Sequence, residues 1–253
     1  MSPSVTVEID ERFRGIPGVA LGGYVGGLLA RELDGGEVTL RRPVPLGKPL
    51  RLLASEDGTT ALLDGDETLA SVRPVAQLET VPGPVTAEEA WAASRRSLQL
   101  SSEYRHPFPG CLVCGAGRAE GDGVRLFAGP VPGRDLVAAP WTPHLAFADA
   151  AGMVRPELVW AVLDCPTIMA LVFQSAPDAT ERVVTGRLAV IRSGPVRAGE
   201  PHVVVGWSAG RQGRAFITGG AILSQDGTPL ALARHTLVPT SWGVPLGLDN
   251  WKA

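Results

Sequence analysis

The pattern of hydrophobic and polar positions predicts two mainly apolar helices, each followed by a series of short strands. The helices are expected at Gly22 to Gly35 and at Pro156 to Phe173, and both are apolar on nearly every face, which is typical of buried helices. The strands are expected at residues 37–42, 50–55, 59–64 and 69–75 after the first helix, and at 186–193, 202–210, 214–224 and 230–238 after the second. Each series contains an Asp-Gly pair that predicts a hairpin turn, at 64–65 and at 226–227.

A short motif occurs once in each half of the chain. PVPLGKP at 43–49 and PVRAGEP at 195–201 share two prolines, a valine and a glycine at one constant offset. An ordinary turn can occur twice by chance, but the shared order of helix, strands and Asp-Gly turn favours a duplication. We therefore expect two domains, residues 1–80 and 123–253, and a connector, residues 81–122. The connector opens a helix through about Leu98 with the capping box of Thr86 and Glu89, before a loop rich in Gly and Pro.

A helix wrapped by a curved antiparallel sheet is the layout of the hotdog fold, and the duplicated copy resembles the double-hotdog proteins. The more specific resemblance is to the hotdog acyl-CoA thioesterases of the phenylacetyl-CoA and 4-hydroxybenzoyl-CoA branches. Their central helix opens with His-Gly-Gly or a similar glycine and carries an acidic residue two turns later. The layout covers nearly the whole chain, whereas the catalytic motifs cover only the two central helices. The resemblance implies an α+β tandem hotdog fold, hydrolysis of an acyl-CoA or acyl-carrier thioester, and a homodimer.

The two central helices match the thioesterase motif in complementary ways. Gly22 and Gly23 match the glycine pair, with leucine in place of the histidine, but Ala30 stands where the acid would be. The second helix has the acid, Asp164, but Pro156 stands eight residues before it, and proline has no N–H to donate. The resemblance therefore implies one composite site per chain. The amides of Gly22 and Gly23 would polarise the thioester carbonyl, and Asp164 would act as nucleophile or general base.

Each of these assignments has a structural alternative. The glycines also suit close packing between helices, and Asp164 could cap a helix that restarts at Pro166. A carboxylate inside an apolar run is costly without a role, which favours catalysis for Asp164. Thr167 lies on the same helical face and could orient a water. Substrate contacts are expected from four further residues, of which the arginines could meet CoA phosphates or simply be solvated: Tyr24, Arg41, Arg42 and Trp160.

Three cysteines are too few for a disulfide framework. The pair Cys111 and Cys114, with His106 nearby, suggests a zinc or redox site, but a structural zinc site needs four ligands and only these three are close in sequence. We therefore expect no metal and no cofactor. The loop is expected to be a structured crossover over the mouth of the site, and Cys165 a buried small hydrophobic residue.

Composition narrows the remaining classes of function. Hydrophobic residues make up 45% of the chain, charged residues 19%, and the formal net charge is −3 without a basic run, so nucleic acid and membrane surfaces are not expected partners. We see no signal-peptide pattern and expect a cytoplasmic protein. Two alternatives stay open: a non-catalytic acyl-CoA-binding protein, and a hotdog hydratase or dehydratase. The latter usually needs a histidine, and neither predicted helix contains one.

Overall fold

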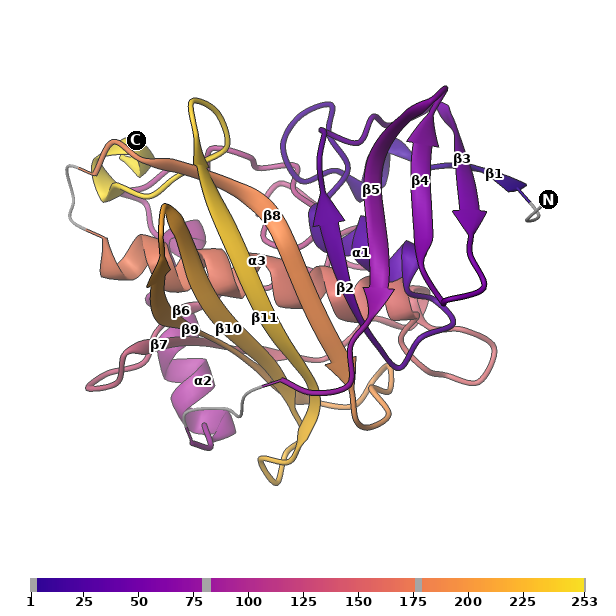
Figure 1. Cartoon of the computed structure of the whole chain (residues 1–253). Helices are drawn as coiled ribbons and strands as arrows, with labels where there is room; N and C mark the ends of the chain where they lie inside the picture. Colours follow the sequence, from indigo (N-terminus) through magenta and orange to yellow (C-terminus); the bar gives the residue numbers. More distant parts are fainter. Residues whose placement is uncertain (1–3, 79–82, 176–178, 253) are drawn as a thin grey trace.

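The computed structural model describes residues 4–78, 83–175 and 179–252, and it contains two similar halves (Figure 1). The elements of the first half are β1 (Ser4–Glu8), α1 (Gly22–Leu29), β2 (Gly35–Leu40), β3 (Pro49–Ala54), β4 (Thr60–Asp64) and β5 (Glu67–Pro74). The connector contributes α2 (Ala87–Ser94). The elements of the second half are β6 (Gly129–Pro130), β7 (Leu136–Trp141), α3 (Pro156–Gln174), β8 (Arg182–Arg192), β9 (His202–Gln212), β10 (Ala215–Leu223), β11 (Pro229–Thr240) and β12 (Val244–Pro245).

All the strands belong to one sheet, with the order β1-β3-β4-β5-β2-β8-β11-β10-β9-β7-β6 and β12 beside β8. The two halves meet where β2 pairs antiparallel with β8, with Val38 opposite Leu188. The strand orders on the two sides of this junction mirror each other, β2-β5-β4-β3 on one side and β8-β11-β10-β9 on the other. The prediction of an α+β tandem fold with its sheets joined edge to edge is confirmed. The predicted domain boundary at residue 80 lies outside the described residues.

The repeated motif has the same structure in both copies. Its glycines, Gly47 and Gly199, have φ of +60° and +80°, a conformation that favours glycine. The valine of each copy is buried, and its backbone carbonyl accepts a hydrogen bond from the segment that leads into the central helix. Ala20 donates to the Val44 carbonyl at 2.9 Å, and Val154 donates to the Val196 carbonyl at 2.8 Å. The motif therefore anchors the start of each helix to the turn before the next strand.

The first central helix is shorter than predicted, because it ends at Leu29 instead of Gly35. Gly35 and Gly36 already belong to β2, which pairs on both sides with β5 and β8. At Gly35 an added Cβ would lie only 2.3 Å from the carbonyl oxygen of Val75, so the backbones approach closely there. Strand pairing at Gly35 and Gly36 therefore ends the helix earlier than the pattern of apolar residues predicts. The connector helix also ends early, at Ser94, although its predicted capping box is present.

The second central helix, α3, agrees with the prediction and forms the centre of the molecule. By length and composition it could span a membrane, but 89% of that window is buried inside the fold, as expected of a core helix. The helix continues through Pro166 without restarting, so Asp164 is not a cap. The alternative that Asp164 caps a helix restarting at Pro166 is thus wrong.

The helices α1 and α3 pack closely because α1 presents glycines to α3. A Cβ added to Gly23 would lie 2.6 Å from the carbonyl oxygen of Trp160, and one added to Gly27 would lie 2.5 Å from the Cα of Glu157. Glu157 is buried and pairs with Arg31, which follows α1. The glycines of α1 therefore do serve as packing residues, which leaves their chemical role to be judged from the site.

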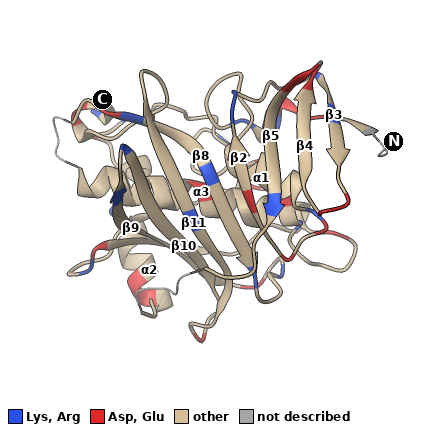
Figure 2. Ribbon diagram, in the orientation of Figure 1, with Lys and Arg blue, Asp and Glu red and all other residues tan. Residues whose placement is uncertain are grey.

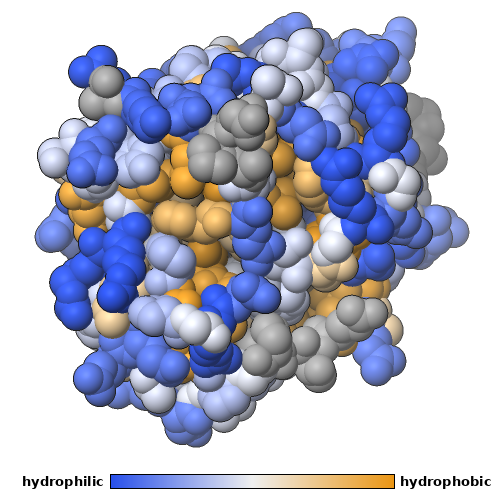
Figure 3. Space-filling model, turned by 90° about the vertical axis from the view of Figure 1, so that its left-hand side faces the viewer, coloured by the Kyte–Doolittle hydropathy of each residue, from blue (hydrophilic) through white to orange (hydrophobic). Residues whose placement is uncertain are grey.

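Acidic and basic positions are interspersed along the ribbons (Figure 2). On the face drawn in Figure 3, apolar side chains are visible in the middle of the surface with polar ones around them.

Candidate active site

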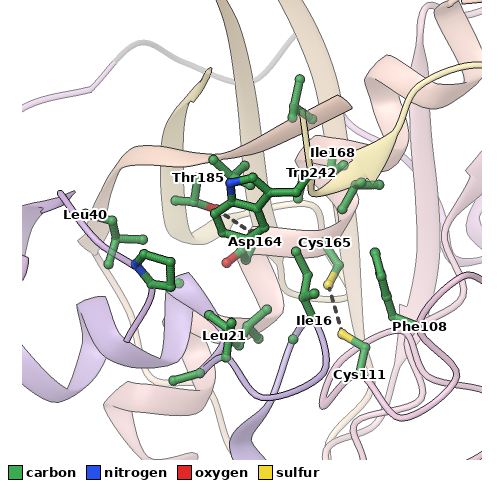
Figure 4. Close-up of a pocket in the computed structure, with 18 of the residues that line it drawn as sticks. Ile16, Leu21, Leu40, Phe108, Cys111, Asp164, Cys165, Ile168, Thr185 and Trp242 are labelled. Atoms are coloured by element: carbon green, nitrogen blue, oxygen red, sulfur yellow. Dashed lines mark hydrogen bonds between the residues drawn. The ribbon is translucent and has the colours of Figure 1, made fainter. Parts of the chain in front are cut away.

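A cavity of about 240 Å³ lies where α1 begins, against the middle of α3, β8 and the connector loop (Figure 4). Its walls are mainly apolar, with contributions from both halves of the chain. The apolar side chains include Ile16, Val19, Leu21, Leu40, Phe108, Ile168, Met169, Val184 and Trp242. The connector loop contributes His106, Phe108, Cys111 and Cys114 to the lining, which agrees with the prediction that this loop lies at the mouth of the site. Such a cavity suits an apolar group of a small-molecule ligand.

The carboxyl group of Asp164 is the acidic group in the wall of this cavity. It is 1% exposed, and its Oδ2 accepts a hydrogen bond of 2.6 Å from the N–H of Gly23 across the two halves. Burial raises the pKa of Asp164 to about 7, although the hydrogen bond from Gly23 opposes this shift. The group can therefore accept or release a proton near neutral pH, as a general base must.

Behind Asp164 lies a chain of hydrogen-bonding groups from three elements. The Thr185 hydroxyl, on β8, is placed to donate to Asp164 Oδ1 at 3.4 Å, and it lies 3.0 Å from His235 Nε2, on β11. The other ring nitrogen, Nδ1, lies 2.7 Å from the Thr167 hydroxyl, which donates to the Asp164 carbonyl at 2.5 Å. Burial lowers the pKa of His235 to about 3, so its ring is neutral.

Because the His235 ring is neutral, only one of its two nitrogens carries a proton, and this limits which groups donate in the series of hydrogen bonds. While Thr167 donates to the Asp164 carbonyl, His235 Nδ1 must carry the ring proton, because two acceptors cannot face each other at 2.7 Å. Nε2 is then an acceptor, and the Thr185 hydroxyl donates to it. In that arrangement Thr185 turns oxygen lone pairs toward the Asp164 carboxyl group. The alternative, with Thr185 donating to Asp164, requires Thr167 to release the carbonyl.

The predicted catalytic residues lie together, but their amides differ. The Gly23 N–H is used by Asp164, so it is not a free donor for a substrate oxygen. Gly22 lines the cavity, and among the described residues no acceptor bonds its N–H. Thr167 is fully buried and does not line the cavity, and its hydroxyl donates to the Asp164 carbonyl and contacts His235 Nδ1. Its predicted role in orienting a water stays a prediction.

The predicted substrate contacts divide into two pairs. Arg41 and Arg42 line the cavity, where Arg41 donates to Ser71 at 2.8 Å and Arg42 to Glu67 at 2.7 Å. Tyr24 and Trp160 do not belong to the cavity lining. Tyr24 stacks on Phe13 with ring centroids 4.0 Å apart, and burial raises the pKa of its hydroxyl to about 12. Trp160 is 1% exposed and packs against the glycines of α1.

The sequence pattern did not reveal Thr185 and His235 as parts of the site. They lie on neighbouring strands in which many residue types occur, and no local motif surrounds them. Both side chains lie near a β-bulge, where the pairing of β8 and β11 shifts between Thr236 and Leu237, opposite Gly186. Bulges of this kind commonly redirect a side chain beside an active site.

The equivalent position in the other half is built differently, because the two carboxylates that line it, Asp34 and Asp149, are exposed and not buried. A second hollow lies where α3 begins, lined by Met153, Pro156, Val159 and the second copy of the repeated motif, among others. Pro156 takes the place of Gly22 there and offers no N–H. This asymmetry agrees with a single composite site in each chain.

The sequence matches no protein-family model and no curated protein, but the structure is similar to solved thioesterase structures. The tesB protein of Mycobacterium avium subspecies paratuberculosis matches with a TM-score of 0.60 and 13% identity, over 94% of this chain and 93% of that one. Acyl-CoA thioesterase II TesB2 from Mycobacterium marinum matches with a TM-score of 0.57 and 13% identity, over the same shares of the two chains. The chain therefore has the double-hotdog fold of the TesB-type acyl-CoA thioesterase II structures.

Proposed function

We propose that this protein hydrolyses an acyl-CoA thioester, or one on a related carrier, at the composite site around Asp164. The observation that carries the proposal is the placement of one buried carboxyl group, with a pKa of about 7, in the wall of an apolar cavity at the junction of the two halves. The thioesterase structures that share the fold add support. A binding protein without catalysis has no need of a carboxyl group with a raised pKa at this place.

The proposed reaction is the attack of a water on the thioester carbonyl. With Thr185 donating to His235, a water beside Asp164 finds two acceptors, the carboxylate and the Thr185 oxygen. Both of its protons are then held, and a lone pair is left for the carbonyl carbon. Asp164 takes one proton as the C–O bond forms, and the proton passes to the departing thiolate as the C–S bond breaks.

The developing negative charge on the carbonyl oxygen needs a donor on the opposite side. We assign this role to the Gly22 N–H, at the start of α1, where helix N–H groups lack partners and the helix dipole is positive. The acyl group then lies in the apolar cavity, and Arg41 and Arg42 lie at positions where they can meet phosphate groups of the carrier. The Gly23 N–H, which was also predicted to polarise the carbonyl, instead holds Asp164 in place.

Hydrolysis of a panel of acyl-CoA substrates tests the proposal. Chromatography after incubation should show equal amounts of free CoA and free acid, and more of both than in a reaction without enzyme. Binding of the substrates without release of CoA would favour the binding protein. Addition of water to an enoyl-CoA, with the thioester left intact, would favour the hydratase.

Replacement of Thr185 by valine tests the water-holding arrangement, because valine keeps the shape and removes the hydroxyl. We expect kcat to fall about 10- to 100-fold, and the free energy of unfolding to fall by about 1 kcal/mol as His235 loses a hydrogen bond. Steady-state kinetics and urea unfolding measure the two effects. An unchanged kcat would show that Thr185 does not contact the attacking water.

A further inference from the structure

Three cysteine side chains from two distant segments of the sequence meet beside the cavity. Cys111 and Cys114 come from the connector loop and Cys165 comes from α3, and all three are buried and free of disulfides. Their sulfur atoms all lie within 4.8 Å of one another, with 3.8 Å between Cys111 and Cys165 (Figure 4). Sequence spacing alone could not include Cys165 in this cluster, which is why a metal site appeared to lack ligands.

The separation of the sulfur atoms suits a common metal ion. Two thiolates bound to one tetrahedral Zn²⁺, each at about 2.3 Å, lie about 3.8 Å apart. A disulfide would need the sulfur atoms at about 2 Å. Sets of thiolate ligands select soft or borderline ions, of which zinc is the usual one in a Cys-x-x-Cys turn.

The loop is also built to stabilise thiolates. The Cys111 sulfur receives hydrogen bonds from the neighbouring Cys114 and Cys165 thiols and from the backbone N–H groups of Cys114 and Val113. The turn is tight, since a Cβ on Gly115 would lie 2.4 Å from the carbonyl oxygen of Cys111. Amide donors directed at a cysteine sulfur are the kind of outer-shell contact that supports a bound metal.

His106 completes the surroundings of the cluster, but as a hydrogen-bond donor. Its Nδ1 accepts from the Phe108 N–H at 2.9 Å, so in the neutral ring Nε2 carries the proton. Nε2 lies 3.2 Å from the Cys114 sulfur and donates to it. The histidine therefore supports the Cys114 thiolate and leaves a fourth coordination position free.

We propose that Cys111, Cys114 and Cys165 bind one Zn²⁺ through their thiolates, with the fourth coordination position directed to the cavity. All three cysteines line the cavity, so a water can reach that position. Binding releases the protons still held by the thiols. The ion ties the connector loop to α3 next to Asp164, and so holds the wall of the proposed active site in place.

Metal analysis of the full chain tests this proposal without reference to activity. The protein is purified without a metal-affinity tag, incubated with a small excess of Zn²⁺ and desalted. We expect one zinc per chain, and after exchange with Co²⁺ a thiolate-to-cobalt absorption band with the intensity of three sulfur ligands. Cys165→Ser should bind zinc at least about tenfold more weakly. Val113→Ala, a change in the same loop at a residue that is not a ligand, should keep full zinc binding.

Three results would overturn the proposal. The first is the absence of zinc binding by the folded wild-type protein, and the second is equal binding by Cys165→Ser. The third is a disulfide between Cys111 and Cys165 in freshly purified protein, seen as a mass lower by two hydrogens. If Cys165→Ser does not fold, the cobalt spectrum of the wild-type chain decides, because an intensity of only two sulfur ligands would contradict a site built from all three cysteines.

Discussion

Replacement of Asp164 by asparagine should lower kcat for acyl-CoA hydrolysis by about 10²–10⁴-fold, the usual contribution of a positioned general base. Asparagine has the same shape and can still accept the hydrogen bond from the Gly23 N–H, but its amide cannot take a proton from water. Because the cavity is unchanged, we expect KM to stay within a few-fold of wild type. Steady-state kinetics with the best substrate of the panel measures both values.

Stability provides the control for this variant. Burial raises the pKa of Asp164 from 3.8 to about 7, so the folded protein holds this proton more tightly than the unfolded chain. Wild-type stability therefore decreases between about pH 4 and pH 7 through this group, by a few kcal/mol at most, since one pKa unit corresponds to about 1.4 kcal/mol. The asparagine variant lacks this loss and should gain stability relative to wild type as pH rises. A variant with full kcat would remove Asp164 from the mechanism.

The parts of the site that the sequence predicts are those that depend on residue type at one place in a helix. The glycines of α1, the acid of α3 and the proline at the start of α3 each have a distinct chemical consequence, and the pseudo-symmetry of a duplicated fold brings the complementary ones together. The structure places Gly23 and Asp164 in direct contact. Their catalytic roles stay predictions until they are measured.

The parts of the site that the sequence does not reveal depend on how segments far apart in the sequence pair and pack in the fold. Thr185 lies beside Asp164, and His235 lies between Thr185 and Thr167, next to a bulge in the pairing of β8 with β11 that no local sequence pattern predicts. Cys165 meets Cys111 only because the connector loop folds back onto α3. The end of α1 was misplaced for a related reason, since the pairing of Gly35 on both sides is a property of the sheet and not of the local pattern.

Replacement of Gly27 by alanine should destabilise the protein by about 1–3 kcal/mol, the usual effect of overpacking a core. The added Cβ would lie 2.5 Å from the Cα of Glu157 and 2.9 Å from the carbonyl oxygen of Pro156, so the backbone of one helix must move. Alanine gains up to about 1 kcal/mol over glycine in helix propensity, which is too little to offset this. Separation of α1 from α3 also lengthens the contact between Gly23 and Asp164, so kcat should fall with stability.

Gly36→Ala is the matched control, because its added Cβ approaches mainly a side chain, with Val72 Cγ2 at 3.1 Å and the nearest carbonyl oxygen at 3.5 Å. We expect it to change the free energy of unfolding by less than about 1 kcal/mol, as a side chain can adjust where a backbone cannot. Urea unfolding of both variants, at one pH and temperature, gives the comparison. A Gly27→Ala protein as stable as wild type would mean that α1 and α3 lie further apart than in this structure. The direct contact between Gly23 and Asp164 would then be contradicted as well.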